Sequence, residues 1–183
     1  MIKISDFVAR LNVAKDVETS RLTFHMIKLF CKFPHMHELI VNAKAEVIPA
    51  IMQTFRDKDL PVLSKREALQ VVPFLVADTA SIDAFVKVRI EDYLIEFLDG
   101  SKDIDRIISQ VFKTIILMHL STTILNIGNE VGTVFVDKGG LTILSQLLVD
   151  KLAESNMNWK VFERLIGTIF VLCFKDKNVD TLK

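Results

Sequence analysis

Apolar residues recur every three or four positions along most of the chain, which is the spacing of one buried helical face. The pattern is clearest in Thr133–Leu148, where a short apolar segment, a glycine break and a second apolar segment follow one another. Alternation with a period of two, which is typical of strands, is nowhere sustained. We therefore predict that the chain is all helical.

Weaker copies of this stretch occur earlier in the chain. Phe85–Leu98 matches it without a gap, Ile40–Phe55 matches it with about two extra residues, and Phe7–Leu11 is a half copy. The apolar anchors are 44, 43 and 50 residues apart, at Phe7, Ile51, Leu94 and Leu144. Spacings of this length are typical of helical repeat proteins. The sequence predicts one domain, 1–183, with repeats at roughly 1–34, 35–80, 81–126 and 127–183.

A longer helical pattern follows each copy, at Val17–Phe33, Ser64–Val76, Asp103–Leu120 and Asn158–Phe174. In the first of these we expect a buried face of Leu22, Met26, Leu29 and Phe30. In the last we expect an apolar face of Val161, Phe162, Leu165, Ile166, Ile169, Phe170 and Cys173. Ser64 and Glu67 have the spacing of a capping box, and Pro73 predicts a kink or an early stop. An insertion falls in Ser121–Gly128, after the third pattern.

The junctions between the shorter helices have a more specific pattern. Gly139 precedes the second helix of the last copy, and Pro49 lies at the expected start of the second helix in Ile40–Phe55. In these features the chain resembles armadillo-type repeat proteins and the related HEAT type. In that family a short helix leads through a glycine into a second helix, often with proline at its start, and a long third helix lines a concave groove. Glu46 and Arg89 replace the glycine in the other copies. The resemblance implies a right-handed α-solenoid of about four armadillo-like repeats.

Charge and composition exclude several functions. The chain has 23 Lys and Arg residues and 23 Asp and Glu residues, whereas a general nucleic-acid binder needs an excess of positive charge. The strongest apolar run, Ile107–Ile127, includes Lys113 and His119, so it is interpreted as a buried helix and not as a membrane span. Cys31 and Cys173 lie within apolar helical patterns. We expect them to be reduced core residues of a cytoplasmic protein, with the nucleus as an alternative.

Residues with catalytic or metal-binding chemistry do not form a recognisable site. Cys31, His35 and His37 are close in sequence, but a fourth metal ligand is missing nearby, so a buried thiol beside two histidines is favoured. Gly128–Gly132 follows no predicted strand and is no phosphate-binding loop. The carboxylates lie mostly in predicted loops or on polar faces. We expect a non-enzymatic protein without metal or cofactor.

The polar faces of the long helices are mostly basic. If these helices line a groove, as the resemblance implies, the groove offers Arg21, His25, Lys28, Lys32, Lys65, Arg66, Gln70, Arg106, Ser109, Lys113, Lys160 and Arg164. An acidic segment of another protein is the expected partner, because Arg can hold carboxylates through two hydrogen bonds. The alternative is a solvated face with local ion pairs. Trp159 is interpreted as a packing residue or a partner contact. Glu163 stands where nuclear import adaptors of the armadillo family have asparagine, so their role is not implied.

The last predicted helix is strongly apolar, whereas the end repeats of a solenoid need a polar outer face. Either the chain is a piece of a longer protein, or a partner or a second copy covers this helix. The function that we predict is a protein-interaction scaffold or adaptor. A dimerisation or assembly module using the apolar end helices is one alternative, and a regulatory subunit of an enzyme or chaperone is another.

Overall fold

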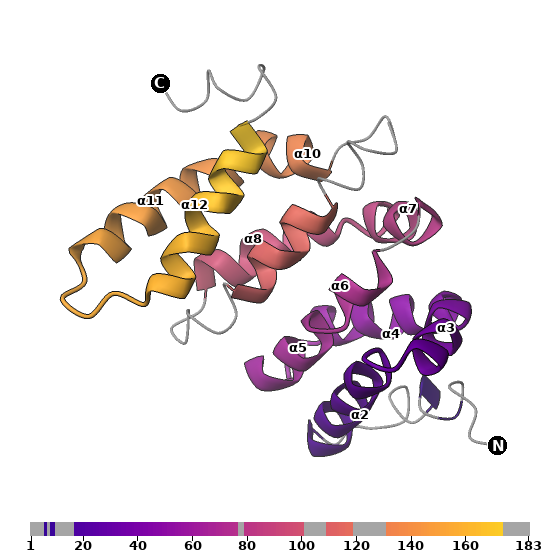
Figure 1. The fold of residues 1–183 in the computed structure, drawn as a ribbon. Coiled ribbons are helices and arrows are strands. Elements are labelled where there is room, and N and C mark those ends of the chain that lie inside the picture. The colour runs from indigo at the N-terminus through magenta and orange to yellow at the C-terminus, as the bar shows by residue number, and fades with distance from the viewer. Residues whose placement is uncertain are drawn as a thin grey trace. The chain divides into compact units, whose positions relative to one another are not determined.

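The computed structural model describes residues 6, 8–9, 17–76, 79–100, 109–118 and 131–173. Within these ranges all regular secondary structure is helical and no strand occurs, as predicted (Figure 1). None of the helices in these ranges is long and apolar enough to cross a membrane. The chain divides into two compact units, Met1–Val88 and Arg89–Lys183. Each unit has a buried apolar core of its own.

The first unit contains α2 (Val17–Phe30), α3 (Pro34–Asn42), α4 (Lys44–Arg56), α5 (Val62–Leu69), α6 (Val72–Leu75) and α7 (Thr79–Lys87). The helix α2 packs along α5, and α4 contacts α3, α5 and α7. Phe24 and Ile27 of α2 and Ile51 of α4 are fully buried in this core. The same core includes Leu69 of α5 and Phe85 of α7.

The buried face of α2 differs from the predicted one. Leu22 is 48% exposed and Met26 is also exposed, whereas Phe24 and Ile27 are inside. Ser20 and Thr23 accompany the buried residues. The Thr23 hydroxyl donates a hydrogen bond of 2.7 Å to a carbonyl of the preceding helical turn, so its burial leaves no polar group unsatisfied. The prediction was wrong because it chose the neighbouring apolar stripe, whereas the buried stripe combines Phe24 and Ile27 with two small polar residues.

The second long helix is interrupted, as Pro73 predicted. The helix α5 ends at Leu69, and α6 begins at Val72 with the proline in its first turn. Proline has no backbone N–H, and its ring clashes with the carbonyl four residues earlier, so a continuous helix is disfavoured. The break therefore lies between Leu69 and Val72.

The predicted capping box at the start of this helix is wrong. The helix α5 begins at Val62, and the N-cap residue is Pro61, with φ −66° and ψ 156°. Ser64 consequently lies inside α5, where its hydroxyl donates to the Val17 carbonyl over 3.4 Å. The Glu67 carboxylate contacts α2 instead of the helix N-terminus.

The second unit contains α8 (Ile90–Gly100), a helical segment at 109–118, α10 (Val131–Asp137), α11 (Gly140–Ala153) and α12 (Trp159–Cys173). The helices α11 and α12 lie side by side, and both contact α10 (Figure 1). Phe112, Phe135 and Leu144 are fully buried in its core. The proposed insertion at 121–128 and Arg106 lie outside the described residues.

The elbow between a first and a second helix has a left-handed backbone in two copies. Gly139 has a φ of 84°, as expected for a glycine that terminates α10 before α11. Arg89, at the equivalent position between α7 and α8, has a φ of 59° although it carries a side chain. A side chain on the next glycine, Gly140, would collide with the ring of Phe135. The two glycines therefore meet different requirements: Gly139 allows the left-handed backbone, and Gly140 leaves space for the Phe135 ring.

The second copy uses a different elbow. Ala43 joins α3 to α4 with φ −91° and ψ 13°, and Glu46 lies within the first turn of α4. Glu46 was predicted at the elbow, and this position is wrong by three residues. Pro49 lies inside α4 and not at its start. Since proline has no N–H, the Ala45 carbonyl lacks the donor that a continuous helix supplies four residues later.

Candidate functional site

The helices α2 and α5 bring several predicted binding residues together. Lys28 Nζ of α2 donates hydrogen bonds of 2.8 Å to Glu67 Oε2 of α5 and of 2.8 Å to Gln70 Oε1, which follows α5. His25 and Arg66 also approach the Glu67 carboxylate. We call His25, Lys28, Arg66, Glu67 and Gln70 the basic cluster. The proximity of residues about 40 positions apart follows from the packing of α2 along α5.

Glu67 is the buried centre of the basic cluster, with its side chain only 6% exposed. Lys28 Nζ lies 2.8 Å from the carboxylate, and His25 Nδ1 and an Arg66 guanidinium nitrogen each lie 3.5 Å from it. Burial by itself would raise the pKa of this carboxyl, but the hydrogen bond and charge of Lys28, with His25 and Arg66, outweigh burial and lower the pKa. Glu67 is therefore ionised at neutral pH.

Sequence reasoning missed Glu67 as a member of this cluster. It assigned the residue to a helix cap because Ser64 precedes it by three positions. A signal was nevertheless present, since Glu67 and Gln70 are three positions apart and so occupy one side of a helix. The residue that they jointly bind, Lys28, could not be identified without the packing of α2 on α5.

The basic cluster has more positive than negative charge. Lys28 and Arg66 are cationic, and Glu67 is its single carboxylate. The Arg66 Nε is buried without a hydrogen-bond partner among the described residues. Close by in sequence, Arg21 forms a 2.6 Å ion pair with the exposed Glu18, and Lys32 is exposed. Arg21 is thus already bonded to a carboxylate, whereas the cluster itself has two cations and one carboxylate.

The predicted binding residues of the second unit are spread over two helices. Lys160 and Arg164 are exposed on α12, and Lys113 is exposed on the segment 109–118. Trp159, at the start of α12, is 69% exposed, and its ring meets that of Phe162 edge to face at a centroid distance of 5.7 Å. Trp159 is therefore not a core residue of its unit. Ser109 is half-buried, and Lys65 of the first unit is also half-buried.

A different ion-pair network, not predicted from the sequence, joins α10 to α8. Lys138 follows α10, and its Nζ contacts Asp92 and, at 3.1 Å, the buried Glu91. The hydrogen bond from Lys138 lowers the pKa of the Asp92 carboxyl. Burial alone would lower the pKa of Lys138, but its bonds to Asp92 and Glu91 raise it. Both carboxylates lie in the first turn of α8, where the helix dipole favours negative charge, so this network has a structural role.

Cys31 and His37 have separate structural contacts. The Cys31 side chain is buried, as predicted, and burial raises the pKa of its thiol to about 11. His37 Nε2 lies 2.9 Å from the Phe74 carbonyl oxygen, and its ring meets the Phe74 ring edge to face. Among the described residues, no group of three or more His, Cys, Asp and Glu side chains could hold a metal ion.

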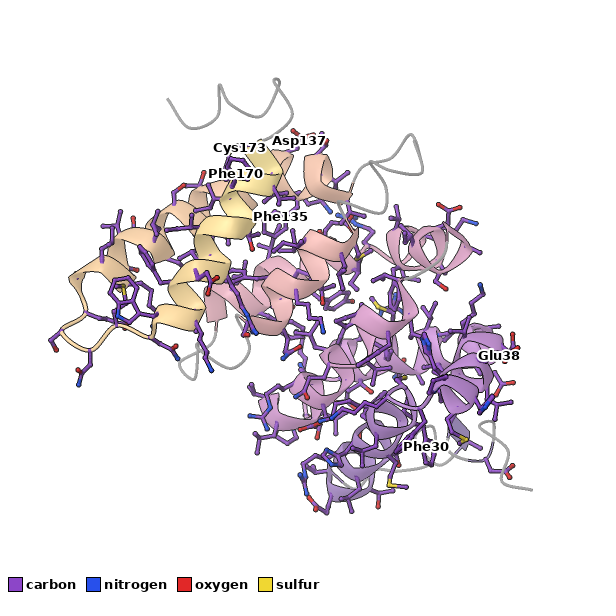
Figure 2. All side chains as sticks on the ribbon, in the orientation of Figure 1. Phe30, Glu38, Phe135, Asp137, Phe170 and Cys173 are labelled. Atoms are coloured by element: carbon purple, nitrogen blue, oxygen red, sulfur yellow. The ribbon has the colours of Figure 1, made fainter. Side chains whose placement is uncertain are left out.

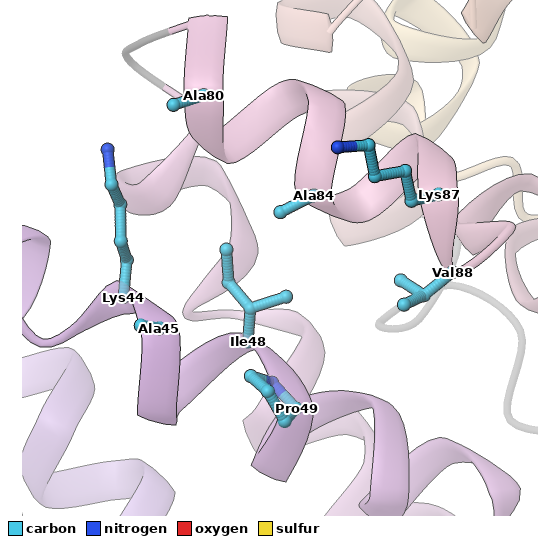
Figure 3. Close-up of a pocket in the computed structure, with 8 residues that line it drawn as sticks. All are labelled: Lys44, Ala45, Ile48, Pro49, Ala80, Ala84, Lys87 and Val88. Atoms are coloured by element: carbon cyan, nitrogen blue, oxygen red, sulfur yellow. The ribbon is translucent and has the colours of Figure 1, made fainter.

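An apolar pocket of about 380 Å³ lies between α4 and α7 of the first unit (Figure 3). Ala45, Ile48 and Pro49 line one side, and Ala84 and Val88 line the other. Lys44 and Lys87 complete the lining, and their aliphatic stems add to the apolar wall (Figure 3). The volume lies in the range of small-ligand pockets, and the basic cluster does not contribute to the lining.

The arrangement of short helices, elbows and longer helices places the chain among the α-solenoid proteins. No protein-family model and no curated protein sequence matches it. Solved structures do match it. An engineered protein of the Northeast Structural Genomics Consortium aligns with a TM-score of 0.73 and 16% identity over 99% of this chain and 67% of that chain.

A designed armadillo repeat protein aligns with a TM-score of 0.71 and 14% identity, over 98% of this chain and 69% of that chain. A second engineered protein aligns with a TM-score of 0.71 and 15% identity, over 99% of this chain and 68% of that chain. The chain therefore has an armadillo-like helical repeat fold, as the resemblance of its junctions implied. At these identities the likeness concerns the fold alone.

Proposed function

We propose that the protein is a non-enzymatic interaction scaffold that binds an acidic segment of another protein along α2 and α5. The observation that carries the proposal is the surplus of positive charge in the basic cluster, which two helices assemble from distant parts of the sequence. Repeat folds of this kind offer extended surfaces, and such surfaces suit an extended partner.

The Glu67 carboxylate pre-organises the cations of the basic cluster for a partner. It holds Lys28 and orients Arg66, so that less side-chain entropy remains to be lost on binding. Arg21 and His25 are more exposed and supply the first contacts, for which the partner's carboxylate replaces Glu18 on the Arg21 guanidinium. Arg in particular can form two parallel hydrogen bonds with a carboxylate.

Exposed apolar residues on α2 extend the same surface. Leu22 and Met26 are each one position after Arg21 and His25, so the apolar stripe lies beside the basic one. A segment with acidic and apolar residues would match both stripes. In this arrangement apolar contacts supply affinity, and the cations set the register. Lys113, Lys160 and Arg164 stay predicted contacts of the second unit.

The buried thiol of Cys31 agrees with a reducing compartment such as the cytoplasm.

Fluorescence anisotropy with labelled 15-residue peptides tests this proposal. The set contains leucine-bearing peptides that are acidic, neutral or basic, and the acidic ones are expected to bind in preference. The double variant Arg21→Glu, Lys32→Glu should weaken this binding by about tenfold or more, since it reverses the charges of the half-buried Arg21 and the exposed Lys32. Binding should also weaken as salt is raised.

The matched control reverses two charges elsewhere in the same unit. Lys58→Glu with Lys87→Glu also changes two exposed lysines, but neither lies on α2 or α5. This control is expected to bind the acidic peptides as the natural chain does. Equal binding of acidic and basic peptides, or an equal loss in both double variants, would contradict the proposal.

A further inference from the structure

The pocket between α4 and α7 exists because the residues that face each other across these helices are small. Two packed helices usually fill the space between them with large apolar side chains. Here the facing positions include three alanines, Ala45 of α4 and Ala80 and Ala84 of α7. Figure 3 shows the Ala84 methyl group and the Ile48 side chain directed towards the space between the helices. A pocket of about 380 Å³ therefore remains although α4 and α7 are in contact.

The pocket is longer along α7 than along α4. On the side of α7 its lining runs from Ala80 to Val88, which is about 12 Å along a helix. On the side of α4 it runs from Lys44 to Pro49, which is about 8 Å. Ile48 is buried, whereas Pro49 and Ala80 are exposed, so the pocket has a buried floor and opens to solvent. An elongated ligand could therefore enter it without unfolding of the first unit.

The lining is apolar apart from two lysines. Water is a poor occupant of such a pocket, because an ordered water needs at least two polar partners. The removal of an alkyl chain from water into the same space is favourable, since it buries apolar surface on both sides. A pocket of this size with an apolar wall and a few polar groups is the usual form of a small-molecule site. The tail of the ligand is therefore expected to be apolar.

The charge around the pocket is positive. Lys44 and Lys87 are the charged residues of its lining. Glu46 of α4 and Asp83 of α7 are acidic, but neither lines the pocket. Glu38 of the neighbouring α3 is exposed and does not line it either (Figure 2). The described lining therefore favours a ligand that combines an apolar body with negative charge.

Lys87 is the residue that can hold the negative charge of such a ligand. Its side chain is exposed, and it has neither an ion pair nor a hydrogen bond within the part of the chain that the structure describes. Figure 3 shows this side chain running back along α7, towards Ala84. Lys44 already takes part in another interaction, so its contribution is the aliphatic stem.

We propose that the pocket between α4 and α7 binds a single-chain carboxylic acid, with its alkyl tail between Ile48 and Ala84 and its carboxylate beside Lys87. A medium-chain acid such as decanoic acid matches the length of the lining. Burial of the tail supplies most of the affinity, and the exposed ion pair adds a smaller part. This site is distinct from the basic cluster, and either proposal can fail without the other.

Isothermal titration calorimetry of the full chain tests the site with three probes that share one tail. The probes are decanoic acid, decanol and decyltrimethylammonium, each below the concentration at which it forms micelles. Decanoic acid should bind with one molecule per chain, decanol about threefold more weakly, and the cationic probe more weakly still. Hexanoic acid should bind about tenfold or more weakly than decanoic acid, because it buries less apolar surface.

A variant that fills the pocket tests where the tail lies. Ala84→Leu should weaken the binding of decanoic acid by about tenfold or more, because the larger side chain occupies the space between the helices. Ala153→Leu, at an exposed alanine of α11 in the second unit, should leave the binding unchanged. A thermal midpoint of Ala84→Leu at or above that of the natural chain shows that this variant is folded.

A second variant tests the carboxylate. Lys87→Met keeps an apolar stem but removes the charge, so decanoic acid should bind it no more tightly than decanol does. The affinity for decanol should stay the same. The control is Lys58→Met, at an exposed lysine that does not line the pocket, and this variant should still prefer the acid.

Three results would overturn the proposal. Absence of saturable binding of decanoic acid would mean that the pocket does not accept an alkyl chain. Equal affinity for all three probes would show that the head group of the ligand has no partner at Lys87. Undiminished binding of the acid by a folded Ala84→Leu variant would place the site elsewhere in the protein.

Discussion

At the scale of single residues, two positions have the same backbone conformation although one is glycine and the other is arginine. Gly139 and Arg89 both have positive φ, and both precede the second helix of a repeat. A side chain at a left-handed position is strained by contact of Cβ with the following carbonyl oxygen. Arg89 therefore bears a cost that Gly139 avoids, and its 2.8 Å ion pair with the partly exposed Asp92 offsets only a small part of that cost.

One substitution at each of these two elbows should change the free energy of unfolding, and the two changes should have opposite signs. Gly139→Ala is expected to lower the free energy of unfolding by about 1 to 2 kcal/mol, because the left-handed backbone then carries a Cβ atom. Arg89→Gly should raise the free energy of unfolding by about 0.5 kcal/mol. Relief of the backbone strain stabilises the variant, and the lost ion pair and the larger backbone entropy of glycine in the unfolded chain offset part of this gain. Urea denaturation measures both. A loss of stability in Arg89→Gly would show that the strain at this elbow is negligible.

The thiol of Cys31 is expected to make stability depend on pH in the alkaline range. Its folded pKa is raised to about 11 from an ordinary value of 9.0, so the folded state retains a proton that the unfolded state loses. Stability should therefore fall as pH rises from about 9 to 11 and be unaffected by this thiol below that range. Urea denaturation across this range tests it. Burial also raises the pKa of Cys173, so this second thiol contributes to the same fall. The variant Cys31→Ala is therefore the reference, and its stability should fall less steeply with pH than that of the natural chain.

At the scale of elements, polar contacts as well as apolar ones hold α2 against α5. Phe24, Ile27 and Leu69 form the apolar part of this contact, and the Lys28–Glu67 pair forms the polar part. A buried carboxylate is costly unless a cation and hydrogen bonds compensate it. The cation closest to Glu67 of α5 is Lys28 of α2, so this pair fixes the alignment of the two helices.

Removing the cation should therefore be worse than removing the whole pair. Lys28→Met is expected to lower the free energy of unfolding by about 1.5 to 3 kcal/mol, because it leaves the Glu67 carboxylate buried without its closest cation. The double variant Lys28→Met, Glu67→Leu should recover most of this loss. Chemical denaturation at neutral pH gives both values.

The pH profile of the same variants gives an independent check. Since the folded pKa of Glu67 is lowered, its contribution is present above the ordinary value of 4.5 and is lost as pH falls through the folded value. The natural chain should lose this contribution in acid, and the double variant should not. If Lys28→Met is as stable as the natural chain at neutral pH, the pair has no role in holding α2 on α5.

At the scale of the whole molecule, repetition of one helical unit explains the fold. The elbows at Ala43, Arg89 and Gly139 recur at intervals close to the predicted repeat length. The boundary between the two compact units, at Val88 and Arg89, falls inside the predicted third repeat, 81–126. A single domain of four repeats stays a prediction. The basic cluster lies in the first unit.

Helical class, repeat spacing and the elbow at Gly139 were determined by the sequence alone, because each depends on neighbours a few positions apart. The break at Pro73 belongs to the same group, since it follows from a missing N–H. The tertiary structure alone decided which face of α2 is buried. Periodicity shows how far apart the buried residues of a helix are, but it does not show which stripe of the helix is buried. A stripe that includes Thr23 can also be buried, because the Thr23 hydroxyl donates a hydrogen bond to its own helix. The tertiary structure also decided the partner of Glu67, because an ion pair between residues 39 positions apart depends on how two helices pack.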